Sequence, residues 1–171
     1  TWAGLAGLTH LPGSLLASVN YFGTVDLLAE LRPLLARGDR PAAVAVSSNS
    51  TTVQPGVPMD LVAACLAGDE DAARAAGDAA GALASYPATK TAVAWWARRQ
   101  APLPEWAGAG ITLNVVAPGA IETPMIEATP ADPVIGEFVD AFPVPVGSLG
   151  TAQELAALVA RAPGRLLGCA Q

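Results

Sequence analysis

Residues 41–48 have the sequence PAAVAVSS, a short apolar run that ends in two serines. An uninterrupted apolar run of this length predicts a strand that is buried on both faces, as in a parallel sheet. Residues 111–117, with the sequence ITLNVVA, predict a second strand, which Pro118 and Gly119 end. The chain between the two runs is helical in pattern, and a strand–helix–strand order predicts parallel strands joined by a right-handed crossover. The fold class that follows is α/β.

The longest helical pattern precedes the first strand. Apolar residues recur at helical spacing from 15 to 37, which predicts a helix of about six turns. Ser14 is the expected N-cap and Gly38 the expected residue just past the end. Pro33 is expected to kink or shorten this helix because it lacks a backbone N–H.

Three further regions are predicted to be helical. Residues 57–84 are rich in alanine and are expected to form one or two short helices. Residues 86–106 and 151–160 are each expected to form one helix, the first ended early by prolines and the second begun by a capping box. The residues expected to break, end or cap these helices are Gly68, Gly77, Gly81, Pro102, Pro104, Thr151 and Glu154.

The composition limits the classes of partner. The 171 residues carry 9 Lys+Arg against 15 Asp+Glu, and 52% of them are hydrophobic. A compact acidic chain lacks the basic surface that nucleic acids require and is repelled by anionic membranes, so neither is expected as a partner. Cys65 and Cys169 form neither a metal-ligand spacing nor a disulfide framework, so no metal is expected. Such cysteine usage favours a reducing, cytoplasmic setting.

Tyr86 and Lys90 are four residues apart in a predicted helix and therefore share one face. A free tyrosine has a pKa of about 10, too high for proton exchange at neutral pH. A nearby ammonium favours the phenolate, so Lys90 is expected to lower the pKa of Tyr86 for acid–base work on an alcohol or carbonyl. The four-residue spacing alone is equally compatible with Tyr86 and Lys90 being two surface side chains without a catalytic role. Ser48 favours the functional interpretation, because it ends a predicted parallel strand, where ligands of open α/β sheets bind.

Five short segments follow one another in a characteristic order: residues 2–4 (WAG), 18–20 (SVN), 46–48 (VSS), 86–90 (YPATK) and 114–123 (NVVAPGAIET). Together they resemble the short-chain dehydrogenase/reductase family. The 38-residue separation of Ser48 from Tyr86 is longer than in most of that family and is similar to the branch that contains bacterial 3α-hydroxysteroid dehydrogenase/carbonyl reductases.

The resemblance implies a Rossmann-type, doubly wound parallel sheet, here partial and without its first βαβ units. Residues 1–171 would form this one partial domain. Within it, residues 57–84 would be a helical insertion between the catalytic serine and tyrosine, and residues 120–146 a substrate-binding loop.

The resemblance also implies residue roles. Tyr86 would be the acid–base group, and Lys90 would lower its pKa and bind the nicotinamide ribose. Ser48 would bind the substrate oxygen, and Asn20 would hold a water of a proton relay. The implied cofactor is NAD or NADP, the substrate a small carbonyl or alcohol, and the assembly a homo-oligomer. The residues expected to bind the cofactor are Ala3, Gly4, Lys90, Pro118, Gly119, Ile121 and Thr123.

The sequence departs from the family pattern near both ends. The Gly-rich turn that binds the cofactor pyrophosphate has no counterpart here, and residues 161–171 do not match the family's last strand. A truncated reductase that keeps the nicotinamide half of the site is therefore expected. Two alternatives stay open. One is a non-catalytic remnant that serves in oligomer packing. The other is an extended-branch sugar-nucleotide epimerase or dehydratase. The sequence of residues 118–123 argues against this second alternative.

Overall fold

The computed structural model describes residues 10–124, 143–145 and 147–161. Its central feature is a pair of parallel strands, β1 (Ala42–Val46) and β2 (Thr112–Val116), in register from one end to the other. The parallel pairing predicted from the element order is therefore confirmed. A second, shorter parallel pair is formed by β3 (Ile121–Glu122) and β4 (Gly150–Thr151).

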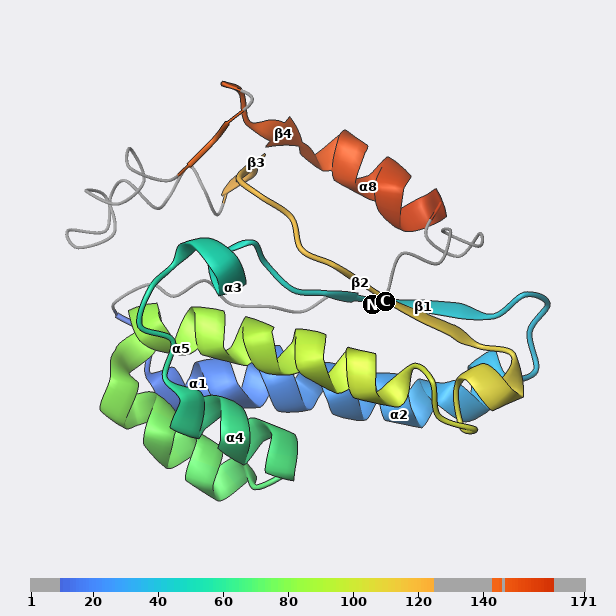
Figure 1. The fold of residues 1–171 in the computed structure, drawn as a ribbon, viewed down its shortest axis with the longest axis horizontal. Helices are drawn as coiled ribbons and strands as arrows, with labels where there is room; N and C mark the ends of the chain where they lie inside the picture. The colour runs from blue at the N-terminus through green and yellow to red at the C-terminus, as the bar shows by residue number, and fades with distance from the viewer. Residues whose placement is uncertain (1–9, 125–142, 146, 162–171) are drawn as a thin grey trace.

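Helices form a layer on one side of β1 and β2, and α8 (Ala152–Arg161) lies on the other side (Figure 1). Within the helical layer, α5 packs against the run of α1, η1 and α2, and α4 packs against α5. The elements of this layer and its connections are α1 (Gly13–Leu16), η1 (Ala17–Phe22), α2 (Gly23–Leu35), α3 (Ser50–Val53), α4 (Met59–Ala67), α5 (Glu70–Gln100) and η2 (Ala107–Ala109).

Only one face of β1 is fully buried. Ala43 and Ala45 are buried, whereas the alternate residues Ala42, Val44 and Val46 are half-buried. Successive side chains of a strand point to opposite faces, so the helical layer covers the first face more completely than the described residues cover the second. The expectation of a strand buried on both faces is therefore wrong for the part of the chain that the structure describes.

The core between the helices and β1 is built from small side chains. Ala17 of η1 and Ala88 and Ala92 of α5 are fully buried in one cluster with Ala45. Small side chains let these backbones approach closely. Toward the far end of the sheet, Trp106 is buried and meets Trp96 edge to face, with ring centroids 6.1 Å apart. An aromatic pair of this geometry adds about 0.5–1.5 kcal/mol to the free energy gained by burial.

The run from 13 to 35 is not one regular helix, because η1 is a π-helix between α1 and α2. The sequence predicted Ser14 as the N-cap of this run, and that prediction is wrong. Pro12 holds that position and offers no capping side chain, and the Ser14 backbone N–H donates instead to Asp78 Oδ1 at 2.8 Å. The cap is supplied from another helix, 64 residues away in sequence.

The end of this run agrees more closely with the pattern. α2 contains Pro33 and stops two residues later at Leu35, as a proline near the end of a helix allows. Gly38 donates its backbone N–H to the Leu35 carbonyl at 2.8 Å and so closes the turn after the helix.

The region 57–84 is helical, as predicted, but its glycines act differently from one another. Gly68 ends α4, and Gly81 interrupts α5 with φ 76° and ψ 163°, a conformation essentially confined to glycine. Gly77 does not break the helix, contrary to expectation. It is the point at which α5 touches α1, because a Cβ at Gly77 would lie 2.7 Å from the Gly13 carbonyl oxygen.

The later helix boundaries follow the predicted signals. α5 ends at Gln100, just before Pro102 and Pro104. The Thr151 backbone N–H donates to Glu154 Oε2 at 2.8 Å, and the Glu154 N–H donates to Thr151 Oγ1 at 3.2 Å. This reciprocal pair is the predicted capping box.

We predict that Gly77→Ala destabilises the chain by about 1–3 kcal/mol, because the added methyl would overlap backbone atoms of Gly13 that cannot rotate away. Gly23→Ala in α2 is the matched control. Its Cβ would meet nothing closer than the Ser18 carbonyl oxygen at 3.4 Å, so the chain should keep its stability or gain up to about 1 kcal/mol. Urea unfolding measures both, and equal midpoints for the two variants would contradict the contact.

Candidate active site

Ser48 lies where the strand pair ends. Pairing continues past β1, since Ser47 donates its backbone N–H to the Val116 carbonyl at 2.8 Å and Asn49 donates to the Pro118 carbonyl at 2.9 Å. Ser48 is therefore held at the carboxyl edge of the sheet. Its Oγ accepts a hydrogen bond from the Ser50 backbone N–H at 3.2 Å, which leaves the hydroxyl proton for donation.

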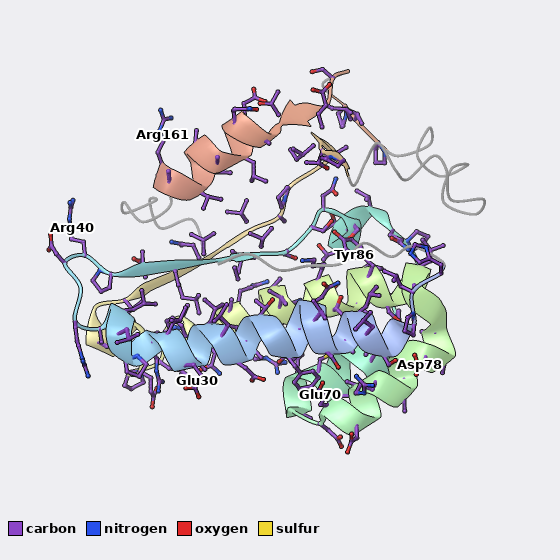
Figure 2. All side chains as sticks on the ribbon, turned by 180° about the vertical axis from the view of Figure 1, so that it is seen from behind. Glu30, Arg40, Glu70, Asp78, Tyr86 and Arg161 are labelled. Carbon is purple, nitrogen blue, oxygen red and sulfur yellow. The ribbon has the colours of Figure 1, made fainter. Side chains whose placement is uncertain are left out.

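Tyr86 lies in α5, five residues after the interruption at Gly81, and its hydroxyl faces the Ser48 side chain closely enough for Ser48 to affect its pKa. Figure 2 shows it close to the connection that carries α3. Burial is the largest influence on this group and raises the pKa of Tyr86, and the Ser48 side chain offsets part of that rise. The expectation that Lys90 makes the pKa of Tyr86 lower than usual is therefore wrong for this structure. Removing the phenolate from water dominates this pKa, and the opposing influence comes from Ser48.

Lys90 shares a helix face with Tyr86, as its spacing predicts. Its Nζ lies 5.9 Å from the centroid of the Tyr86 ring and donates to the Val46 carbonyl at 3.1 Å. Only 8% of the residue is exposed, and this burial lowers the pKa of the ammonium to about 8. Lys90 therefore stays largely protonated at neutral pH but releases a proton far more readily than an exposed lysine does.

Asn20 is fully buried within η1. A π-helix has one more residue per hydrogen-bonded turn than an α-helix, and such turns are rare and concentrate at functional sites. The apolar periodicity of residues 15–37 gave no sign of it, because one extra residue hardly disturbs a pattern of this length.

The segment after β2 approaches the same edge of the sheet. Pro118 binds Asn49 through its carbonyl, and a Cβ at Gly119 would lie 3.6 Å from Asn49 Nδ2. Ile121 then enters β3, and Thr123 Oγ1 donates to the Ile121 carbonyl at 3.3 Å. Ala3, Gly4 and most of the expected loop 120–146 lie outside the described residues.

Sequence reasoning missed Ser47, the residue before the expected catalytic serine. Its side chain is buried, and its Oγ donates to the Lys90 backbone carbonyl at 2.8 Å. Lys90 Nζ in turn donates to the Val46 carbonyl, so the strand end and α5 are joined by two hydrogen bonds, one donated from each side. A second serine beside Ser48 was the only available signal, and it did not identify the partner.

Over residues 10–124, 143–145 and 147–161, no three His, Cys, Asp or Glu side chains gather as a metal site would require. Among the helices of those same residues, none combines the length and apolar character needed to cross a bilayer.

Comparison with known proteins matches residues 71–161, just over half of the chain, to the family model described as Enoyl-(Acyl carrier protein) reductase. A stretch of 80 residues is 44% identical to the 3-oxoacyl-(acyl-carrier-protein) reductase of Escherichia coli, covering 47% of this chain and 31% of that protein.

Two longer matches cover nearly the whole chain. The 3-alpha-hydroxysteroid dehydrogenase/carbonyl reductase of Comamonas testosteroni is 38% identical over 162 residues, which are 92% of this chain and 62% of that protein. The crystal structure of the 3-alpha-hydroxysteroid dehydrogenase from Pseudomonas sp. B-0831 complexed with NADH superposes with a TM-score of 0.88 at 41% identity. It covers 96% of this chain and 64% of that one. The chain thus spans about three fifths of the length of these relatives. On the strength of these matches and of the shared fold, the chain belongs to the short-chain dehydrogenase/reductase family.

Proposed function

We propose that this chain carries the nicotinamide and substrate part of an NAD(H)-dependent oxidoreductase that interconverts a carbonyl compound and a secondary alcohol. The observation that carries the proposal is the joint placement of Ser48, Tyr86 and Lys90. The Ser48 side chain acts on the Tyr86 hydroxyl at the carboxyl edge of the parallel strands, and Lys90 Nζ lies beside the Tyr86 ring.

In the reducing direction, Tyr86 donates its phenolic proton to the substrate oxygen as that oxygen gains negative charge. The raised pKa keeps the phenol protonated at neutral pH, which is the form a proton donor needs. Ser48 donates a second hydrogen bond to the same oxygen, because the bond accepted from the Ser50 N–H leaves the Ser48 hydroxyl proton available. Lys90 then returns a proton toward Tyr86, since its lowered pKa makes release easy. Asn20 would continue this relay through a bound water.

The residues present fit the nicotinamide half of a dinucleotide. The Lys90 ammonium has three N–H donors, and Val46 accepts one of them, so the others are available to ribose hydroxyls. Pro118, Gly119, Ile121 and Thr123 follow the strand end and would line the nicotinamide ring and its carboxamide. When bound, the nicotinamide supplies or accepts the hydride. NADH is our first choice of cofactor because the structural relative from Pseudomonas is complexed with it.

The substrate class follows from the two longer relatives. Both are named for 3α-hydroxysteroids, and one of them also for carbonyl reduction. We therefore propose 3-oxosteroids and simple ketones as the first substrates to assay.

Tyr86→Phe should lower kcat for NADH-dependent ketone reduction by at least about 100-fold, because the substrate oxygen loses its proton donor. NADH affinity should stay close to that of the parent chain, since Lys90 and the segment 118–123 are untouched. Steady-state kinetics and a fluorescence titration of NADH measure the two quantities. Retained kcat in this variant would remove Tyr86 from the proposed role. A folded parent chain that binds NADH but reduces no ketone would favour the non-catalytic remnant.

Lys90 is the sole lysine of the sequence, so ¹³C-lysine labelling gives one side-chain signal. We expect its Cε resonance to titrate with a midpoint of about 8 in the folded chain and of about 10.4 after denaturation. Between these two values the unfolded chain binds more protons than the folded one. The contribution of Lys90 to the free energy of unfolding therefore rises with pH across this window. Lys90→Met should remove that slope. A midpoint near 10.4 in the folded chain would contradict the buried position.

A further inference from the structure

The helices between 59 and 80 have no part in the proposed chemistry, yet they contact the helix run that carries Asn20 at several points. We propose that α4 and the part of α5 before Gly81 act as a positioning element for Asn20, with Asp78 as its positioning residue. This inference rests on the proposed function. The proposal assigns a function to the region 57–84, whose residues take part in no step of the proposed proton relay.

Asp78 caps the Asn20-bearing run from outside. The first backbone N–H groups of a helix have no partner within the helix, and Pro12 offers α1 no capping side chain. Asp78 Oδ1 takes one of these donors, the Ser14 N–H, at 2.8 Å. Hydrogen bonds from Ser14 lower the pKa of Asp78, so the side chain is a carboxylate at neutral pH. A negative charge at a helix N-terminus is favourable.

A second contact, which we call the glycine junction, consists of Gly13, Gly77 and Ser85. A Cβ on Gly13 would overlap the Gly77 carbonyl and lie 2.7 Å from Ser85 Oγ. Ser85 is fully buried, and its Oγ donates to the Gly77 carbonyl at 3.0 Å. Ser85 directly precedes Tyr86, so the start of α1, the helix with Asp78 and the helix with Tyr86 meet at one point. Figure 2 shows Asp78 and Tyr86 at the same end of the molecule.

A third contact lies two residues before Asn20. Ser18 Oγ donates to Glu70 Oε1 at 2.5 Å and accepts from Arg74 Nη1 at 2.6 Å. These groups are exposed, so they add little to stability. Their effect is on the position of the helix run. Ser14 and Ser18 are both hydrogen-bonded to residues of α5, and the π-helix begins between them, at Ala17. Asn20 lies two residues after Ser18.

Lys90 and Ser48, two other members of the proposed relay, do not depend on these contacts. Lys90 is bound to Val46 and to Ser47, and Ser48 is held by the strand pairing. Loss of the Asp78 bond should therefore move Asn20 relative to Lys90 and Ser48 and leave the latter two in place. The expected signature is a lower kcat with unchanged NADH affinity, which general destabilisation of the fold would not produce.

The test compares Asp78→Ala, which removes the acceptor, with Asp78→Asn, which keeps an oxygen at that position. Asp71→Ala is the matched control, because Asp71 is another exposed aspartate of α5. The sequence has three asparagines, at 20, 49 and 114, so ¹⁵N-asparagine labelling gives three resolvable side-chain NH₂ pairs. We expect Asp78→Ala to shift the Asn20 pair and leave the Asn49 pair in place. Asp78→Asn should restore most of the parent position, and Asp71→Ala should change nothing.

In the kinetic arm, Asp78→Ala should lower kcat by up to about 100-fold, the scale of loss when a relay group is displaced by about 1 Å. An unmoved Asn20 pair in Asp78→Ala would overturn the inference. If the parent chain reduces no ketone, the proposed function fails while the NMR arm still decides whether Asp78 positions Asn20. If Asp78→Ala does not fold, Arg74→Met removes a bond to Ser18 instead and should shift the same pair.

Discussion

The site depends on two hydrogen bonds that join the end of β1 to α5. Lys90 Nζ donates to the Val46 carbonyl, and Ser47 Oγ donates to the Lys90 carbonyl. Because Val46, Ser47 and Ser48 are consecutive, holding the first two fixes the third. Lys90 also lies one helical turn after Tyr86, so the same bonds set the distance between Tyr86 and Ser48. The small side chains of Ala88 and Ala92 let α5 approach the strand closely enough for these bonds to form.

Burial has opposite effects on the two titrating groups of this arrangement. It raises the pKa of Tyr86 and lowers that of Lys90, because each loses water around its charged form. Their pKa values therefore move apart, with that of Tyr86 above that of Lys90, so transfer of a proton from Lys90 to a Tyr86 phenolate becomes favourable. A protonated Tyr86 beside a lysine that readily yields a proton suits carbonyl reduction, the direction in which the tyrosine must donate.

Local patterns predicted the local features of the chain. The apolar runs and the Thr151–Glu154 box correctly indicated the parallel strands and the start of α8. Tyr86 and Lys90 lie on one helix face, as their spacing required. The failures involve contacts between distant segments. Asp78, and not the Ser14 side chain, caps the start of α1. Gly77 lies in the contact between α5 and α1 and does not break its helix, and burial has the largest influence on the pKa of Tyr86. No local window of sequence contains both partners of such a contact.

The most direct test of the account is a titration of the folded, ¹³C-lysine-labelled chain with NADH, followed through the single Lys90 signal. If Lys90 binds the nicotinamide ribose, NADH should shift that signal in a saturable way, and AMP, which lacks the nicotinamide riboside, should not. A Lys90 signal that stays unmoved at saturating NADH, in a chain shown to be folded by circular dichroism, would contradict the assignment of this site to a nicotinamide cofactor.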